Sequence, residues 1–469
     1  MMRPAPPTRR LNPISTGADI LAFSIGLTGS FMVKLVGELP VSEALILLIL
    51  PVLLIMHGRR LLRPGLKIIF ILLALWLFSQ VLTDIYRGTS AFDWVRSDAN
   101  ICFFAIDLVC VAVLLGRNER RKVIFIAAYA IGSLLATRYQ PSQEAVQYPW
   151  KFGYAGGIIS LVILASCYFY SRRRYTIALI LLAGIMGVNL LKNYRGPVLD
   201  LLIVIALVMP LIPERIGRLR LLPRKGTGLR VVVLATMALG AGMAAAGLVY
   251  WVTAAGLVGE EAQIKNQAEA QSGGGLLLGG RPEILVSSQA VWDSPILGHG
   301  SYARDFKYIE MLNDIEARWG QQLDLRDVEQ QGQGLIPAHS HLMGAWVQAG
   351  ILGAVFWAYV LWLSLKGIVR VSLLLPPLAP LYAMMLVSFV WGIWFSPFAS
   401  TERTQAALVI IFTLDLLDTK VPGFQALERP SRSKWRRSPL RGPLAVSRSN
   451  VNVPPSGATR IPGPFDPRR

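Results

Sequence analysis

The chain has 469 residues, of which 53% are apolar and only 16% are charged. Soluble domains carry about 25% charged residues, so this composition excludes an ordinary soluble domain and indicates a membrane protein. The formal net charge of +19 does not indicate a nucleic-acid partner, because +9 of it lies in the C-terminal tail, where no aromatic stacking pattern accompanies the arginines.

Twelve apolar segments follow one another along the chain. About 17 to 25 apolar residues are needed to cross roughly 30 Å of hydrocarbon, so each segment is a candidate span. The sequence therefore predicts an all-α polytopic membrane protein, with spans one to nine in residues 17–255 and spans ten to twelve in residues 338–419. The predicted spans cover residues 17–37, 41–57, 66–85, 99–116, 122–138, 154–171, 175–192, 196–213, 229–255, 338–366, 378–398 and 403–419.

The short loops between these segments alternate in charge. Four are basic, "HGRRLLRPGLK", "GRNERRK", "SRRRY" and "PERIGRLRLLPRKGTGLR", whereas "DIYRGTSAFDWVRSDAN" and "TRYQPSQEAVQYPW" carry little net positive charge. Because basic short loops stay in the cytoplasm, the pattern places both termini there, including residues 1–16. The first span has no clear small-residue cleavage site, so we interpret it as an uncleaved anchor.

One long loop, residues 256–337, separates spans nine and ten on the outer face. It holds twelve acidic and six basic residues, a net charge of −6, opposite in sign to the rest of the chain. Its first part, "EEAQIKNQAEAQSGGGLLLGG", predicts a short polar helix that ends in a glycine hinge. Its second part, "RPEILVSSQAVWDSPILGHG", predicts a helix that begins at Pro282 and lies flat on the membrane over a cavity.

The last 50 residues, 420–469, form a tail rich in Pro, Ser and Arg with a net charge of +9. Such a segment buries too little apolar surface to fold, so we expect a disordered cytoplasmic tail against anionic membrane lipids. The three cysteines, Cys102, Cys110 and Cys167, fall within predicted spans without metal or disulfide spacing, which is typical of small core residues.

Two of the four histidines, His339 and His341, lie together at the start of span ten in "IPAHSHLMGAWVQAG". If Pro337 opens this helix, both lie in its first turn, where the helix dipole keeps an imidazole neutral, as a general base requires. An interfacial histidine wetted by lipid headgroups is an equally simple interpretation. A metal site is a third, although no ligand spacing points to a metal; its additional ligands would be Glu283, Asp324 or Glu329.

Three arginines lie at the predicted outer face. Arg195 sits in a tight hairpin, "LKNYRGPVLDLL", where it either anchors the interface or is retained for a function. Arg281 joins a glycine run to an apolar helix, and Arg403 begins span twelve with Glu402 as its expected partner. A planar guanidinium suits bidentate binding of phosphate oxygens. These cations and a neutral histidine predict an outer-face site for a phosphate-bearing substrate.

The energy for such a reaction has to come with the substrate. The chain contains neither a glycine-rich ATP-binding loop nor a Ser-His-Asp context. An activated lipid pyrophosphate meets this requirement outside the cytoplasm. The spans show no internal repeat and few charges near their middle, which counts against a symmetric transporter.

Several of these motifs resemble the O-antigen ligase and polysaccharide polymerase superfamily of bacterial inner-membrane glycosyltransferases. "GRPEILVSSQAVWDSPILGHG" is similar to the family's loop, with its Gly-Arg, Trp, Pro and Gly-x-Gly. "AHSHLMGAWVQAGILG" resembles the family's histidine followed eleven residues later by Gly-x-x-Gly, and "NYRGPVLDLL" resembles its Ser-Arg-Gly segment. The resemblance implies a C-type glycosyltransferase-like fold with a periplasmic active site.

The resemblance also implies roles for particular residues. Arg281 and Arg195 would bind the diphosphate of a polyprenyl-diphosphate-linked glycan, and His339 would activate the acceptor hydroxyl, with neither a metal nor another cofactor. The family's Asn after this histidine is Ser340 here, which leaves His341 as a possible substitute. The expected reaction is an inverting transfer to a glycan, lipid-core or protein acceptor in cell-surface polysaccharide biosynthesis. The alternative is a twelve-span transporter or lipid-linked-glycan flippase.

Overall fold

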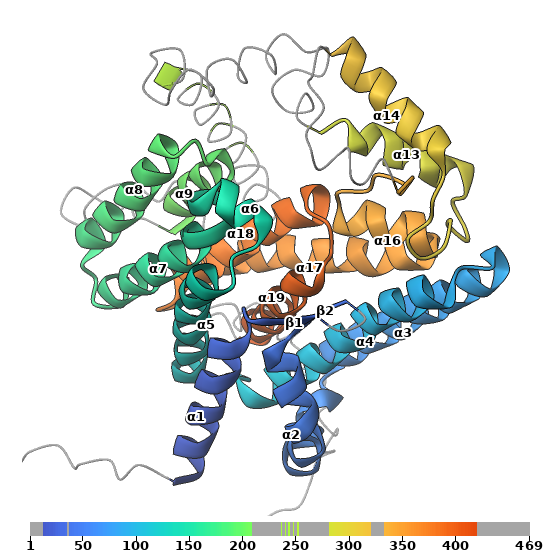
Figure 1. Cartoon of the computed structure of the whole chain (residues 1–469). Coiled ribbons are helices and arrows are strands. Elements are labelled where there is room, and N and C mark those ends of the chain that lie inside the picture. Colours follow the sequence, from blue (N-terminus) through green and yellow to red (C-terminus); the bar gives the residue numbers. More distant parts are fainter. Residues whose placement is uncertain are drawn as a thin grey trace, which may run out of the picture. The chain divides into compact units, whose positions relative to one another are not determined.

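The structure of the chain, a computed structural model, describes residues 13–34, 37–208, 281–319 and 333–419, together with six positions between 236 and 252. The described chain is mostly helical, as expected of an all-α membrane protein (Figure 1). The first half contains α1 (Pro13–Thr28), β1 (Met32–Lys34), β2 (Glu38–Pro40), α2 (Val41–His57), η1 (Gly58–Leu62), α3 (Pro64–Arg87), α4 (Ala91–Leu114), α5 (Glu119–Tyr139), α6 (Gln143–Gln147), η2 (Pro149–Tyr154), α7 (Ala155–Ser171), α8 (Tyr175–Leu191) and α9 (Arg195–Val208). The second half contains α13 (Glu283–Asp293), α14 (Phe306–Arg318), α16 (His341–Ala349), α17 (Ile351–Leu374), α18 (Ala379–Phe395) and α19 (Ser400–Asp418).

Five helical stretches in the described residues are long and apolar enough to cross a membrane. They are α3, α4, α5, α7 together with its π-helical start η2, and α17. Four shorter apolar helices lie in α1, α2, α8 and α18. The chain is therefore a membrane-embedded protein, whereas twelve spans remain a prediction. Most of the ninth span, the loop to residue 280, residues 320–332 and the tail lie outside the described residues.

Three predicted spans, the first, the fourth and the tenth, differ most from the structure. The first span ends at Thr28, and its predicted outer end instead forms the antiparallel hairpin β1–β2, with Val33 opposite Leu39. Helix α4 begins eight residues before the predicted span at residue 99. The tenth span is broken at Gly350 into α16 and α17. The helix α14 was not predicted, although Asp305 caps it and its apolar residues recur at helical spacing.

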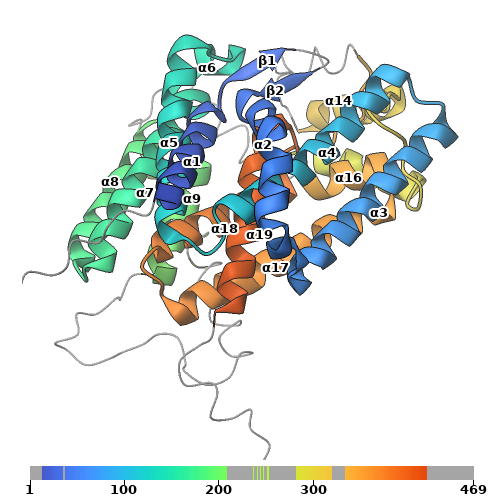
Figure 2. The ribbon, with the colours of Figure 1, turned by 90° about the horizontal axis from the view of Figure 1, so that it is seen from below.

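The core surrounds α17, which packs against α3, α18 and α19 (Figure 2). These helices are apolar around most of their circumference, so their mutual faces are filled by large side chains. Trp357 and Phe356 of α17 are fully buried with Phe104 of α4. Trp76 of α3 lies 5.2 Å from Phe356 between ring centroids. His341, the first residue of α16, packs against Trp357 in this aromatic layer.

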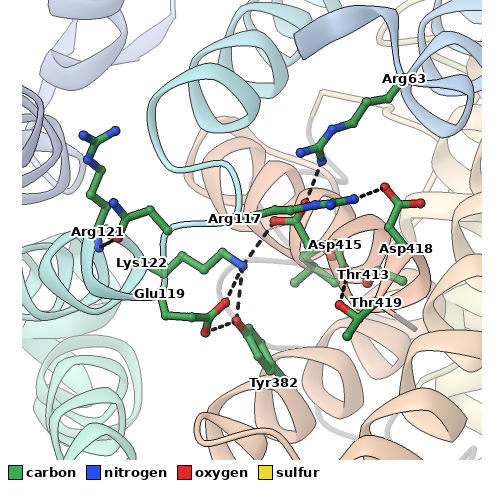
Figure 3. A network of polar contacts seen from close by, with 12 residues as sticks. Arg63, Arg117, Glu119, Arg121, Lys122, Tyr382, Thr413, Asp415, Asp418 and Thr419 are labelled. Atoms are coloured by element: carbon green, nitrogen blue, oxygen red, sulfur yellow. Dashed lines mark hydrogen bonds and ion pairs between the residues drawn. The ribbon is translucent and has the colours of Figure 1, made fainter. Parts of the chain in front are cut away.

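A charged network joins helix ends at the C-terminus of α19 (Figure 3). Lys122 is fully buried, and its Nζ lies 3.2 Å from Asp415 and 3.1 Å from Glu119. Arg63 donates to Asp415 at 2.7 Å, and the Tyr382 hydroxyl donates to Glu119. A buried ammonium is tolerated only when it is paired in this way. The network ties α3, α5, α18 and α19 at the end of α19 opposite Ser400.

At the C-terminal end of α3, the loop after α13 is hydrogen-bonded both to α3 and to the junction of α16 and α17 at Gly350. Gly298 accepts from Arg87 Nη2 at 2.8 Å, and His299 N–H donates to the Val347 carbonyl at 2.7 Å. The Ile351 N–H donates to the Ile296 carbonyl at 3.2 Å. The Gly-x-Gly and Gly-x-x-Gly motifs of the sequence therefore meet in space, and each serves close backbone packing.

Gly350→Ala is expected to unfold this junction. Gly350 has φ +71°, and an added Cβ would lie 1.9 Å from the Ile296 carbonyl oxygen, so both the backbone and the loop would have to move. We expect a lower melting temperature in detergent, measured by thermal unfolding. Gly184→Ala is the matched control, because a Cβ there meets nothing within 4 Å. Equal melting temperatures for the two variants would contradict this role of Gly350.

Candidate active site

Three segments converge where α18 ends. A helix leaves its last carbonyl groups without partners inside the helix, and here side chains supply the donors. Ser340 Oγ donates at 2.8 Å, Arg281 Nη1 at 2.7 Å and His341 Nδ1 at 2.6 Å. The carbonyl acceptors, in the same order, belong to Ile393, Phe395 and Ser396. The starts of α13 and α16 are thereby fixed on the end of α18.

His339 lies just before α16 and contacts Glu283 in the first turn of α13. Its Nδ1 is 3.1 Å from Glu283 Oε1, and the side chains are 28% and 16% exposed. Burial alone would raise the pKa of Glu283, but the hydrogen bond and charge of His339, with the charge of Arg281, lower it overall. An ionised carboxylate only accepts, so Nδ1 carries a proton in this contact, and in the neutral form of the ring Nε2 is the unprotonated nitrogen.

The helix start differs from the prediction. Ser340 is the N-cap of α16 and accepts from the Met343 N–H at 3.1 Å, so the helix begins at His341 and not at Pro337. His339 is therefore extended chain and only His341 belongs to the first turn. A serine N-cap is preferred over proline here because its side chain satisfies a free N–H group.

His341 packs into the aromatic layer. It is 1% exposed, and its ring lies 4.7 Å from Trp357 and 5.4 Å from Phe398 between centroids. Its Nδ1 donates to the Ser396 carbonyl, while its Nε2 is buried without a described partner. An acceptor hydroxyl cannot reach this nitrogen in the present conformation. The structure therefore gives His341 a packing position and leaves His339 as the accessible imidazole.

Arg195 begins α9 at the same end of the bundle. Ser388 of α18 donates to Asp200 of α9 at 2.6 Å, which fixes the level at which the two helices contact. The last turn of α7 touches both Val208, which ends α9, and the beginning of α18, so α9 and α18 are antiparallel. At 1.5 Å per residue, Arg195 lies about 7.5 Å beyond Asp200, towards the level where α18 ends.

Arg403 occupies a different environment from the predicted one. It forms a bidentate pair with Glu43 of α2, with both contacts 2.7 Å, and donates to Asn100 of α4 at 2.6 Å. Its partner is therefore Glu43 and not Glu402. Asn100 also donates to the Phe398 carbonyl at 3.3 Å, in the loop that His341 contacts. Because Glu43 and Asn100 already accept hydrogen bonds from this guanidinium, we do not assign Arg403 to phosphate binding.

Glu43→Ala is expected to lower the free energy of unfolding by about 3 to 5 kcal/mol, because it leaves the buried guanidinium of Arg403 without its carboxylate. Denaturant unfolding in detergent measures this loss. Glu38→Ala, at an exposed position nearby, is the control and should change little. Additive losses in Glu43→Ala, Arg403→Ala and the double variant would contradict the pairing.

The predicted metal ligands do not form a described cluster. Glu283 contacts His339, but Asp324 and Glu329 lie outside the described residues. Within the part of the chain that the structure covers, no group of three or more His, Cys, Asp or Glu side chains is placed to hold a metal ion. The described contacts therefore pair Glu283 with a histidine and with no further metal-ligating side chain.

Comparison of the sequence with models of known protein families finds no match, and comparison with curated protein sequences finds none either. The resemblance stated above therefore rests on its motifs alone. What the fold adds is their juxtaposition: the Arg-Pro-Glu segment of α13 and the histidine segment before α16 are more than 50 residues apart in sequence and meet at one helix end. The sequence offers Glu283 only as a metal ligand, whereas the structure shows it as the hydrogen-bond partner of His339.

Proposed function

We propose that this protein is a membrane glycosyltransferase of the bacterial inner membrane that moves a glycan from a polyprenyl-diphosphate carrier to an acceptor hydroxyl on the periplasmic side. The observation that supports it best is the Glu283–His339 pair, which lies beside Arg281 at the end of an apolar helix. A base oriented by a carboxylate, next to a phosphate-binding cation, provides two groups that a glycosyl transfer needs.

His339 acts as the general base in this proposal. Glu283 accepts the Nδ1–H, so the bare Nε2 takes the proton from the acceptor hydroxyl. The carboxylate also stabilises the imidazolium that forms, as a third group does in other nucleophile–base arrangements. A positioned base of this kind contributes about 10² to 10⁴-fold to a rate.

Arg281 and Arg195 neutralise the leaving diphosphate. The starts of α13 and α16 lie at the end of α18, and the start of α9 lies towards the same level, so these helix N-termini add a potential that favours anions. The acceptor oxygen attacks the anomeric carbon while the bond from this carbon to the phosphate oxygen breaks. The lipid diphosphate leaves with the electron pair, the proton stays on His339, and the anomeric configuration inverts.

The direct test uses the purified protein in proteoliposomes with lipid-linked repeat units. We expect release of the polyprenyl diphosphate together with a new glycosidic bond, detected by mass spectrometry. Chain growth without another acceptor identifies a polymerase, whereas transfer only after adding a lipid core or a protein identifies a ligase. Absence of any bond formation with all three acceptors contradicts the proposal.

Glu283→Gln is expected to slow transfer by about tenfold to 10³-fold while His339 stays in place, because the amide oxygen still accepts the Nδ1–H but carries no charge. The loss of negative charge disfavours the imidazolium, so the acid limb of the pH–rate profile should move to lower pH. Rates measured from pH 5 to 9 check this. An unchanged profile would show that Glu283 has no electrostatic role.

A second candidate function, a transporter or lipid-linked-glycan flippase, is favoured by buried acids that the sequence analysis did not expect. Glu43 and Asp107 are fully buried and Asp200 is 7% exposed. Intramembrane carboxyl groups commonly mark ion or proton pathways. The two functions are distinguished by whether the donor is cleaved: a flippase moves a labelled lipid-linked glycan across a vesicle membrane intact, whereas a glycosyltransferase releases the polyprenyl diphosphate.

A further inference from the structure

The helix α13 has two different apolar faces. Val286, Ala290 and Val291 are buried against α14 and α16, where they form a small core with Tyr308 and Val347. On another face Leu285 is 39%, Trp292 80% and Ile296 69% exposed. Leu285 and Trp292 are seven residues apart and therefore lie on one side of the helix, and Ile296 follows three residues after the helix ends at Asp293. We call Leu285, Trp292 and Ile296 the apolar rim.

The backbone around the rim is fixed on two membrane-crossing candidates. The Ile296 carbonyl accepts from the N–H of Ile351, the first residue of α17. Two residues before it, Ser294 Oγ accepts from Arg87 Nη2 at 2.8 Å, at the last residue of α3. Ile296 thus lies at the ends of α3 and α17 and not on a free loop.

The exposed surface of those two helices is itself apolar and reaches the rim. Ile85 and Tyr86 at the end of α3 are 65% and 69% exposed, and Ile351 and Val355 at the start of α17 are 39% and 40% exposed. Both helices are long and apolar enough to cross a membrane. Their exposed side chains face lipid in a membrane-embedded protein, so the rim continues a lipid-facing surface.

We propose that the apolar rim docks on the phospholipid bilayer, at the boundary between headgroups and acyl chains. Tryptophan is the side chain most typical of this boundary, and an amphipathic helix lying in it exposes large apolar residues on one face. Beside the apolar rim, the surface of the same helix carries Gln289 and Asp293, which bond to each other and, through Asp293, to Lys307. The helix is thus held by α14 on one side and by lipid on the other.

Docking has a consequence for the site, because Arg281 and Glu283 begin the helix whose far end meets the bilayer. Docking of the rim holds Arg281 and Glu283 close to the level of the lipid headgroups, where the diphosphate of a lipid-borne donor lies. This consequence rests on the proposed function, whereas docking itself does not. A failed transfer assay would therefore leave docking standing, and failed docking would leave the chemistry of His339 standing.

The experiment places a fluorophore at the rim. Trp292→Cys and Ile296→Cys are made in the full chain with Cys102→Ser, because Cys102 is the exposed native cysteine while Cys110 and Cys167 are buried. Each is labelled with an environment-sensitive nitrobenzoxadiazole dye and reconstituted in phosphatidylcholine–phosphatidylglycerol vesicles. Glu310→Cys, at an exposed position of α14, is the matched control. Melting temperatures near that of the parent show that the labelled variants are folded.

We expect spin-labelled phosphatidylcholine to quench the dye at residues 292 and 296 at least threefold more than at 310, and aqueous iodide to do the reverse. Strong iodide quenching at the rim with no lipid quenching overturns the proposal. Weak quenching by both agents, with self-quenching between labelled copies, also overturns it, because the rim would then be covered by a second copy of the chain.

Discussion

Replacing His339 with Ala is expected to lower the rate of glycan transfer by about 10² to 10⁴-fold without removing the protein from the membrane. The reason is geometric: His339 is the accessible imidazole of the pair, and its Nδ1 contact with Glu283 leaves Nε2 as the nitrogen that can accept a proton from the acceptor hydroxyl. Release of polyprenyl diphosphate in proteoliposomes measures the rate, and thermal unfolding shows whether the variant is folded.

His341→Ala is the informative comparison for this variant. It removes a ring from the aromatic layer around Trp357, so its main effect should be a lower melting temperature. His339→Ala removes a partly exposed side chain and should change the melting temperature far less. If transfer survives in His339→Ala and disappears in a folded His341→Ala variant, the base has been assigned to the wrong histidine.

Arg281→Gln is expected to lower transfer by about 10² to 10³-fold, the usual cost of losing one donor to the developing charge. Arg281→Lys keeps the charge but loses the planar fork, so it should recover only part of the rate. One N–H of Arg281 donates to the Phe395 carbonyl and its charge acts on Glu283, and a guanidinium has five N–H donors in all, so further donors are present for a diphosphate. Initial rates against donor concentration give kcat and KM.

Arg304→Gln is the matched control for Arg281, since Arg304 lies in the same long loop, is 50% exposed and pairs with Asp93. It should leave transfer nearly unchanged. Similar losses in the two variants would point to a general requirement for positive charge in the loop. A normal rate in Arg281→Gln would remove Arg281 from the proposed site.

The helices themselves were predictable to within a few residues where apolar runs are long. The second span, 41–57, coincides with α2, and spans in α3, α5, α8 and α18 differ from the structure by at most three residues at either end. Hydrophobicity is a local property of the chain, so it is readable from the sequence. Gly350 shows the limit of this reading, because its positive φ breaks an apolar run that hydropathy treats as continuous.

The residues of the candidate site were likewise predictable only in part. The sequence by itself determined that this is a membrane-embedded helical protein, and its motifs singled out Arg281 and His339. Only the tertiary structure decided that Glu283 orients His339, that His341 is buried, and that Arg403 belongs to Glu43, 360 residues away. The physical reason is that apolar patterning is local, whereas the partner of a charged group depends on which helix ends meet when the bundle packs.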